Sequence, residues 1–246
     1  MKTVSRLFVA LLALGWTHTA AAQSADDIVE KYLTAIGGKA ALAKITSRTM
    51  TGTITLSTPQ GDVSGPVEIY SAVPNKSRTV VKLDLSQFGV GQMTVDQRFD
   101  GTSGYVLDTL QGNREITGGQ LDNMKNNAFP TPLLNYKARG ATVELAGSEK
   151  IGERDAYVLL LKGQGGTLSR LFIDAGSYLP LKSIVKLEVP QIGEVEQTTE
   201  FSDYREVDGI KVPFEVHANS AVQTSRIVIT KVEHNAKIDD AMFSKP

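Results

Sequence analysis

The sequence contains no cysteine among its 246 residues, and this single absence removes several kinds of chemistry. Without cysteine the chain can form no disulfide, thiolate nucleophile, zinc ribbon, iron–sulfur cluster or cysteine-linked lipid anchor. Aromatic side chains are also scarce, at 7% of the residues, and there are only three histidines. Stability and function must therefore come from apolar burial, backbone hydrogen bonds and ordinary polar side chains.

An excess of charge of either sign is also missing. The 26 Lys and Arg residues nearly balance the 27 Asp and Glu residues, which gives a formal net charge of −1. This balance argues against a nucleic-acid partner bound by bulk electrostatics. With 41% hydrophobic and 22% charged residues, the composition is that of a globular protein, and it excludes collagen-like, disordered and multi-span membrane classes.

Residues 1–22 have the pattern of a secretory signal peptide. Two basic residues precede an apolar run from Leu7 to Trp16, and Ala22 completes an A-x-A cleavage site. The run is about half as long as the roughly 20 residues of a membrane-spanning helix, so a membrane anchor is the weaker interpretation. We expect cleavage after Ala22 and export to a bacterial periplasm, as a protein that is not integral to the membrane.

Removal of this segment further reduces the set of side chains that could carry out chemistry. It would take away two of the 26 basic residues and none of the 27 acidic ones, so the net charge falls from −1 to about −3. The only tryptophan leaves as well, and His217 and His234 are the histidines that remain. Two histidines and no cysteine offer little material for a metal site or for acid–base catalysis. We therefore expect no metal, no cofactor and no enzymatic activity.

The start of the mature chain predicts a helix. Ser24 can act as its N-cap, the two acidic residues that follow the next alanine favour the positive end of its dipole, and apolar residues recur every four positions from Ile28 to Ile36. The pair of glycines after Ile36 ends this helix. The Ala- and Leu-rich residues 39–45 predict a second, short helical turn.

From Ser47 onward the apolar period changes from helical spacing to every second residue. Met50, Gly52 and Ile54 share one face of a predicted strand while threonines take the other. Similar segments follow over most of the chain, separated by short turns that contain Gly, Pro or Asp. This pattern predicts an antiparallel meander with one wet and one covered face, in a single domain over residues 23–246. No linker or low-complexity run indicates a second domain.

Residues 117–138, called here the cover segment, interrupt the strand pattern. Leu121, Met124 and Ala128 recur at helical spacing, and two prolines at positions 130 and 132 then break the helix. A helical, apolar insertion in a sheet protein can cover the dry face of the sheet. Two interpretations remain open, a helix that completes the core and a lid that moves over an apolar cavity.

Two glycine-containing motifs lack the context that catalysis would need. Residues 101–104 (Gly-Thr-Ser-Gly) fall one residue short of a nucleophile elbow and precede no predicted helix. The glycine-rich residues 163–166 are followed by no Lys-Ser or Lys-Thr pair, so a phosphate loop is not indicated. Both motifs predict hairpin turns, and His217 and His234 are expected at the surface or at a sheet edge.

Three stretches carry a resemblance to a known family. They are DDIVEKYLTAIGG from Asp26, the strand pairs from Phe172 that include FSDYREVDGIKVPF from Phe201, and the ending from Val232 to Phe243. In these stretches the chain resembles periplasmic outer-membrane lipoprotein-sorting proteins of the LolA/LolB-like superfamily. The resemblance spans nearly the whole mature chain, and it consists mainly of the order of strands and of the residues in the turns between them.

The resemblance implies a fold and an activity. The implied fold is mainly β, an antiparallel sheet curled into an incomplete barrel and covered by an N-terminal helix and a central helical lid segment. Carriers of this type shield lipoprotein acyl chains in an apolar cavity. Their lid is held by an Arg just before the Pro that ends the second strand, but here Val73 precedes Pro74, and the nearest arginine, Arg78, belongs to the next strand.

A curled sheet collects its apolar positions into one concave surface, and this gives the predicted ligand-binding set. The predicted lining residues are Ile54, Ile69, Val81, Leu83, Met93, Val95, Leu159, Leu171, Ile173, Val185, Leu187, Phe201 and Ile229. The predicted lid residues are Leu121, Met124, Phe129 and Leu133. The function expected from them is binding or carriage of lipoprotein acyl chains or another lipid. The alternative is an envelope interaction or sensor module that binds a partner protein through the same concave face.

Overall fold

The computed structural model describes residues 23–163, 168–189 and 193–246, so the predicted signal peptide lies outside the described residues. The helices of this part are α1 (Ala25–Ala35), α2 (Lys39–Leu42) and α3 (Gly118–Asn126), with 3-10 turns η1 (Ser86–Phe88), η2 (Lys137–Arg139) and η4 (Asp240–Phe243). The strands are β1 (Ser47–Thr58), β2 (Gly61–Ala72), β3 (Lys76–Asp84), β4 (Gln92–Phe99), β5 (Gly104–Asp108), β6 (Arg114–Ile116), β7 (Thr142–Ile151), β8 (Arg154–Lys162), β9 (Leu168–Asp174), β10 (Pro180–Val189), β11 (Gly193–Val207), β12 (Ile210–Ser220) and β13 (Thr224–His234).

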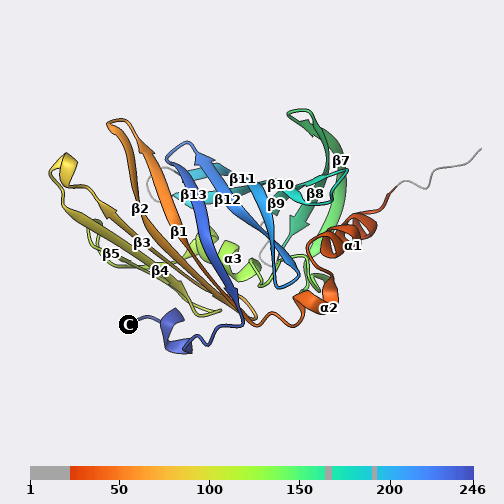
Figure 1. The fold of residues 1–246 in the computed structure, drawn as a ribbon, viewed down its shortest axis with the longest axis horizontal. Helices are drawn as coiled ribbons and strands as arrows, with labels where there is room; N and C mark the ends of the chain where they lie inside the picture. The colour runs from red at the N-terminus through yellow and green to blue at the C-terminus, as the bar shows by residue number, and fades with distance from the viewer. Residues whose placement is uncertain (1–22, 164–167, 190–192) are drawn as a thin grey trace, which may run out of the picture.

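These strands form one antiparallel sheet (Figure 1) in the order β6-β5-β4-β3-β2-β1-β13-β12-β11-β10-β9-β8-β7. Strands that follow one another in the sequence are neighbours throughout, apart from the cover segment, and β1 pairs with β13 at the centre of the sheet. The edge strands β6 and β7 stand at opposite ends of this order, so the sheet curls without closing. The prediction of an antiparallel sheet that forms an incomplete barrel is confirmed.

Two glycines allow neighbouring strands to approach closely in the curled sheet. A Cβ atom at Gly52 would lie 2.2 Å from the carbonyl oxygen of Val228, and one at Gly65 would lie 1.9 Å from that of Lys82. The pairing of β1 with β13 also shifts its register between Thr51 and Gly52, and such a bulge increases the local bend of a strand. Close backbone approach therefore requires glycine at both positions.

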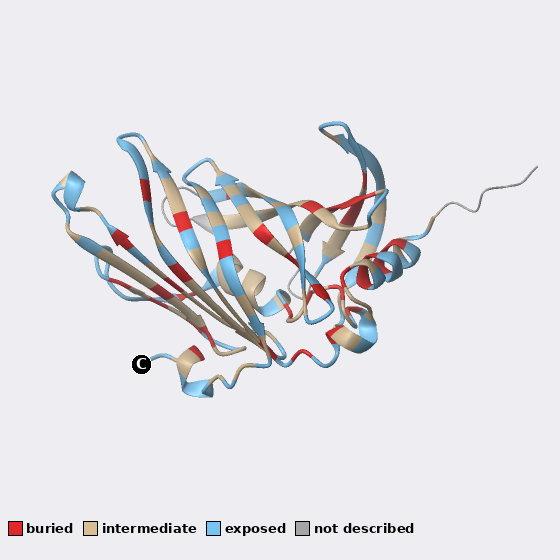
Figure 2. Cartoon of the chain, viewed as in Figure 1, coloured by how far each residue is buried: buried red, intermediate tan, exposed pale blue. Residues whose placement is uncertain are grey.

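Helix α1 covers one end of the sheet's inner face and contributes four buried residues to the main core cluster. The Ser24 hydroxyl accepts a hydrogen bond from the Asp27 backbone N–H, which confirms the predicted N-cap, and the Asp27 carboxylate in turn accepts one from the Ser24 N–H. The apolar stripe of α1, with Ile28 and Leu33 at 0% and 1% exposure, packs against β8, β9, β12 and β13. Figure 2 shows this buried side of the helix turned toward the strands.

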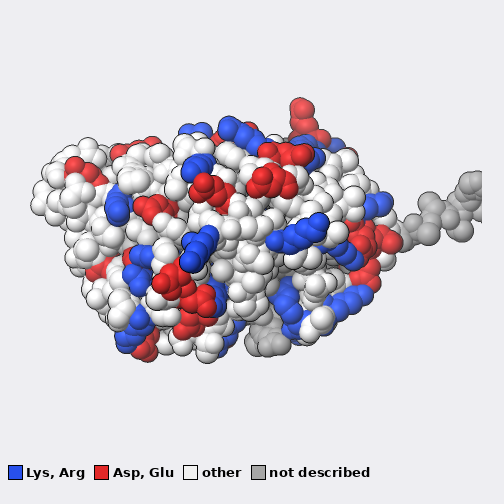
Figure 3. Space-filling view, turned by 60° about the horizontal axis from the view of Figure 1, so that its bottom comes forward, with Lys and Arg blue, Asp and Glu red and all other residues white. Residues whose placement is uncertain are grey.

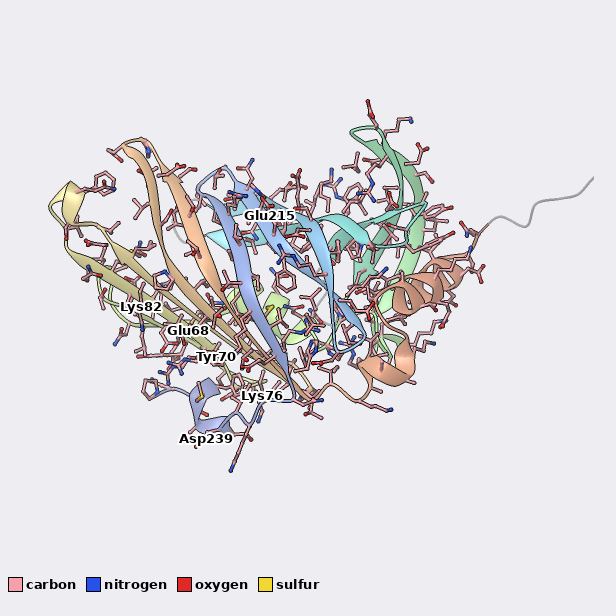
Figure 4. The ribbon with its side chains drawn as sticks, viewed as in Figure 1. Glu68, Tyr70, Lys76, Lys82, Glu215 and Asp239 are labelled. Atoms are coloured by element: carbon pink, nitrogen blue, oxygen red, sulfur yellow. The ribbon has the colours of Figure 1, made fainter. Side chains whose placement is uncertain are left out.

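The C-terminal turn η4 packs beside β3 and β4. Phe243 is 1% exposed there, the Lys76 ammonium lies 2.8 Å from the Asp240 carboxylate, and the Arg98 guanidinium donates to the Ser244 carbonyl at 3.1 Å. Figure 4 shows Lys76 close to Asp239, the residue before η4, at the lower edge of these strands. The end of the chain is thereby attached to the half of the sheet that α1 does not cover.

The cover segment is helical over only part of its length. Helix α3 ends at Asn126, and Ala128, expected on the same helix, is buried in the irregular stretch that follows. Pro130 explains the early end, because proline lacks the N–H of the helix ladder and disfavours helical geometry at the preceding residue. The segment then continues to η2 without another α-helix.

Candidate functional site

A cavity of about 1170 Å³ lies between the inner face of the sheet and the cover segment, partly open to solvent. Its walls include residues of β8 to β12 on one side and α3 with residues 130–132 on the other. The volume exceeds the roughly 300–1,000 Å³ that is usual for small-molecule sites. The space is therefore large enough for an extended apolar ligand.

The strand registers place all thirteen predicted lining residues on one face of the sheet. Cross-strand partners such as Val81 and Val95, or Leu159 and Leu171, lie directly opposite each other, and side chains alternate between faces along each strand. The same face carries Gln97 and Thr199, which line the cavity. Periodicity alone thus identified the inner face correctly.

Only part of that face borders the cavity. Leu171, Val185, Leu187 and Phe201 line it. The other nine predicted residues pack elsewhere. Three of them lie in the core against α1: Leu159, Ile173 and Ile229. Five belong to a second cluster, in which Ile54 and Leu83 are buried and Ile69, Val81 and Met93 are partly buried, and Val95 is half-buried between β3 and β5. Helix α1 and the curvature of the sheet account for this difference, since both bury inner-face residues. A ligand-binding role for the four cavity residues stays a prediction.

The predicted lid residues separate in the same way. Met124 lines the cavity, whereas Leu121 lies at a second, smaller pocket beside β5 and β6. Leu133 is 1% exposed within the α1 core, and Phe129 packs against that core. Phe129 and Leu133 therefore belong to the core, whereas α3 and residues 130–132 cover the cavity.

Apart from Met124, the residues of helix α3 that line the cavity are polar, where the sequence predicts an apolar side. No residue of α3 is buried, and the side of the cover toward the cavity carries Gln120, Asn123, Asn126 and Asn127. Asn123 Nδ2 donates to the Lys186 carbonyl at 2.9 Å, which attaches α3 to β10. Of the three residues at helical spacing, Met124 lies at the cavity as predicted, whereas Leu121 borders the second pocket and Ala128 follows the end of the helix.

Further contacts attach the cover on its other sides. Asn75 Nδ2, in the turn between β2 and β3, donates to the Lys125 carbonyl at 3.3 Å. The Asn126 side chain fills the space that a Cβ atom at Gly163 would need, since such an atom would lie 2.3 Å from it. Helix α3 is thereby held from β10, from the β2–β3 turn and from the end of β8.

Arg48 of β1 is a cavity residue that the sequence analysis did not single out. Its Nε donates to Nε2 of His234 at 3.0 Å, and its guanidinium carbon lies 5.3 Å from the centre of the Phe129 ring. Burial lowers the pKa of Arg48 to about 10, so it remains a cation at neutral pH. Arg48 thus places a positive charge at the cavity wall, directly against the cover segment.

His234 lies behind Arg48 on the central strand β13, so the expectation of a position at the surface or at a sheet edge was wrong. Its side chain is 1% exposed, and its Nδ1 lies 3.3 Å from the Asp208 carboxylate. Because Nε2 accepts from Arg48, the proton of the neutral ring belongs on Nδ1. Burial, followed by the charge of Arg48, lowers the pKa of His234. The ring therefore connects Arg48 to Asp208 as a neutral intermediary.

The cover segment also makes buried polar contacts with α1. The hydroxyls of Tyr32 and Thr131 lie 2.7 Å apart, and burial raises the pKa of Tyr32 to about 12. Arg139 donates to the carbonyls of Pro132 and Leu134, the latter at 3.3 Å, and burial lowers its pKa. These bonds fix the irregular stretch that follows α3.

Val73 stands where the lipoprotein carriers have the arginine that holds their lid, and here other residues attach the cover segment. Val73 is 43% exposed, and Arg78 points to the outer face, where it pairs with Asp96. Instead, the Phe129 backbone N–H donates to the Pro74 carbonyl at 2.9 Å, and Arg48 contacts the Phe129 ring. The cover segment is therefore attached here without an arginine before Pro74.

The described residues offer no cluster of three or more His, Asp or Glu side chains that could hold a metal ion. The two histidines of the described residues lie apart, since His217 pairs with Glu215 on the surface and His234 is buried beside Arg48. No described helix is long and apolar enough to cross a membrane. What the geometry does provide is a large cavity with apolar and basic walls under a partly helical cover.

These features define a class of fold, an unclosed antiparallel sheet that holds a cavity between its inner face and a helical cover. Solved structures of other proteins share this fold, among them the following three. A LolA superfamily protein from Nitrosomonas europaea has a TM-score of 0.57 at 16% identity over 91% of this chain and 99% of its own. A DUF1329 family protein from Desulfovibrio piger gives 0.56 at 13% identity, over 89% and 97% of the two chains.

The third is an outer membrane lipoprotein-sorting protein domain from Vibrio parahaemolyticus, with a TM-score of 0.54 at 11% identity over 88% of this chain and 94% of its own. No family model matches the sequence, and no curated protein matches it significantly. At these identities the likeness shows the fold alone. The resemblance to the LolA-like superfamily is confirmed at that level.

Proposed function

We propose that the mature protein is a periplasmic carrier that holds lipoprotein acyl chains or another lipid in its cavity and catalyses no reaction. The observation that carries this proposal is the cavity of about 1170 Å³ on the inner face of the sheet. Leu171, Val185, Leu187 and Phe201 supply apolar wall, and burial of an acyl chain gains about 0.8 kcal/mol per methylene group. Affinity of this kind needs no catalytic group.

The fold supports the same proposal. The structures that share it include a protein described as LolA superfamily and a protein domain described as lipoprotein-sorting. The pattern of residues 1–22 agrees with a place in the bacterial envelope, where such cargo occurs. Binding of an envelope protein through the inner face is the alternative, and it predicts a stable protein partner in place of lipid.

A neutral apolar fluorophore, N-phenyl-1-naphthylamine, tests the proposal directly. We expect saturable binding by the mature protein and displacement by long-chain acyl compounds. The variant Val185→Trp fills part of the cavity and should weaken binding about tenfold, a change of about 1.4 kcal/mol. The matched control is Val222→Trp in the exposed β12–β13 turn, which should bind as the unmodified protein does.

The outcomes separate the two functions. Equal binding by both tryptophan variants would place the fluorophore outside the cavity and contradict the proposal. Absence of any binding, together with a protein partner retained from an envelope extract, would favour the interaction module.

A further inference from the structure

Basic residues outnumber acidic residues on the cavity walls, although the two are nearly equal in the whole sequence. The described wall carries the basic residues Arg48, Lys125, Arg139 and Lys211 and a single acidic residue, Asp122. Over the full sequence, by contrast, 26 basic residues face 27 acidic ones. Figure 3 shows both signs interspersed over the outer surface in that view, with no large patch of one sign. The positive bias therefore belongs to the cavity.

Arg48 contributes a charge that no described carboxylate neutralises directly. Other arginines of the sheet have such partners: Arg78 and Arg98 pair with Asp96, and Arg154 pairs with Asp174. None of the described ion pairs includes Arg48, whose described hydrogen bond uses only Nε. The two terminal nitrogens of the guanidinium are thus available for a ligand in the cavity.

The groups behind Arg48 orient it without cancelling its charge. His234 accepts the Arg48 hydrogen bond, and a ring that accepts at Nε2 is neutral. Asp208 lies one ring further away, and its side chain is 67% exposed, so water screens much of its charge. Phe129 covers the guanidinium on the side of the cover segment. Arg48 is therefore held in place by contacts that leave it cationic.

We infer that the cavity takes an amphiphile with an anionic head group, a carboxylate or a phosphate, which pairs with the guanidinium of Arg48 while the apolar chain lies against Leu171, Val185, Leu187 and Phe201. Guanidinium groups bind both anions through two parallel hydrogen bonds, and partial exclusion of water strengthens such a pair. This inference rests on the proposed function and narrows its ligand to an anionic lipid.

Displacement of N-phenyl-1-naphthylamine by two ligands of equal chain length tests the inference. Dodecanoate and dodecanol differ only in the head group, and at mildly alkaline pH only dodecanoate is charged. We expect dodecanoate to bind about tenfold more tightly to the unmodified protein, as is usual for a hydrogen-bonded charge pair. In Arg48→Met, which keeps the apolar stem of the side chain, that preference should vanish, while Arg48→Lys should keep part of it.

A matched arginine lies outside the cavity. Arg170 of β9 points to the outer face and pairs with Glu196, so Arg170→Gln removes the same charge and should keep the full preference. If Arg48→Met does not fold, as judged by its thermal unfolding, the comparison of the two ligands in the unmodified protein and in Arg48→Lys decides the matter.

Each contrary result has a separate meaning. Equal binding of dodecanoate and dodecanol would overturn the anionic head group and leave the lipid carrier intact. Failure of both ligands to displace the fluorophore would overturn the carrier itself. Inorganic phosphate that competes as strongly as dodecanoate would identify a site for free anions and would overturn the amphiphile.

Discussion

Asp96 is held between two arginines on the outer face of the sheet. The Arg78 guanidinium donates to both carboxylate oxygens at 2.8 Å, and Arg98 donates to Oδ2 at 2.8 and 3.1 Å. Burial alone would raise the pKa of Asp96, but the hydrogen bonds from the two arginines outweigh it and lower the pKa. The residue is 6% exposed, so its charge depends on these partners.

Removing that charge should destabilise the fold. In Asp96→Asn two largely buried guanidinium groups lose their carboxylate, and we expect a loss of about 3 kcal/mol in the free energy of unfolding. Chemical denaturation measures this loss. The control Asp155→Asn removes a carboxylate from an exposed pair with Lys150 and should cost under about 0.5 kcal/mol. Equal losses in the two variants would contradict the account of Asp96.

His234 should make the stability depend on pH. Its pKa in the folded chain lies below the ordinary value of 6.5, so the unfolded chain takes up a proton first as the pH falls. The contribution of His234 is therefore complete above 6.5 and declines as the pH falls through that value toward the lowered pKa. Arg48 and Asp208 are the charged groups that face the ring.

The variant His234→Gln tests this dependence, because glutamine keeps an acceptor for Arg48 and cannot be protonated in this range. The free energy of unfolding, measured between pH 5 and pH 8, should decrease less steeply toward acidic pH in the variant than in the unmodified protein. The same slope in both proteins would mean that His234 has no lowered pKa.

Arg48 could have been found from the sequence, although its partners could not. It stands two residues before Met50 on a strand whose apolar face was predicted, so alternation already places it on the inner face. A single basic residue on a face that is otherwise apolar is the sequence feature that could have indicated a charged group at the cavity. His234 lies 186 positions further along, and only the pairing of β1 with β13 brings the two together.

At the scale of elements, the close contact between β2 and β3 at Gly65 should tolerate no larger residue. In Gly65→Ala the new methyl group would lie 1.9 Å from the Lys82 carbonyl oxygen, so the strands must separate. We expect a loss of about 2–3 kcal/mol in the free energy of unfolding, measured by chemical denaturation.

The control for this prediction is Gly176→Ala in the turn between β9 and β10. Its methyl group would meet only the Asp174 carboxylate, at an ordinary distance of 3.5 Å. The cost should stay under about 1 kcal/mol. A Gly65 variant as stable as the Gly176 variant would show that the curl of the sheet does not depend on this contact.

Sequence periodicity predicted the strands well and the cover segment poorly, for a physical reason. A strand needs only alternation, so one apolar residue such as Val81 fixes the face of its neighbours. A short helix needs both its phase and its end to be predicted, and α3 ends before Ala128, one of the three residues whose spacing indicated the helix. The sequence also could not predict which residues of the inner face belong to the core and which line the cavity, because this depends on where α1 packs.

At the scale of the whole molecule, the predicted export can be checked on the mature protein. Expression of the full chain in a bacterium and mass spectrometry of the periplasmic fraction should give a polypeptide that begins at Gln23. An intact N-terminus at Met1, or recovery of the protein only from the cytoplasm, would contradict the predicted signal peptide and the proposed localisation.

A lipid held in the cavity between the sheet and α3 should remain bound when the protein is purified from the periplasm. Native mass spectrometry, followed by solvent extraction and identification of any released compound, detects such a ligand. We expect a bound species that is released on unfolding, carries at least one acyl chain and has an acidic head group. A ligand-free protein that also takes up no fatty-acyl compound when one is offered would contradict the proposed carrier function.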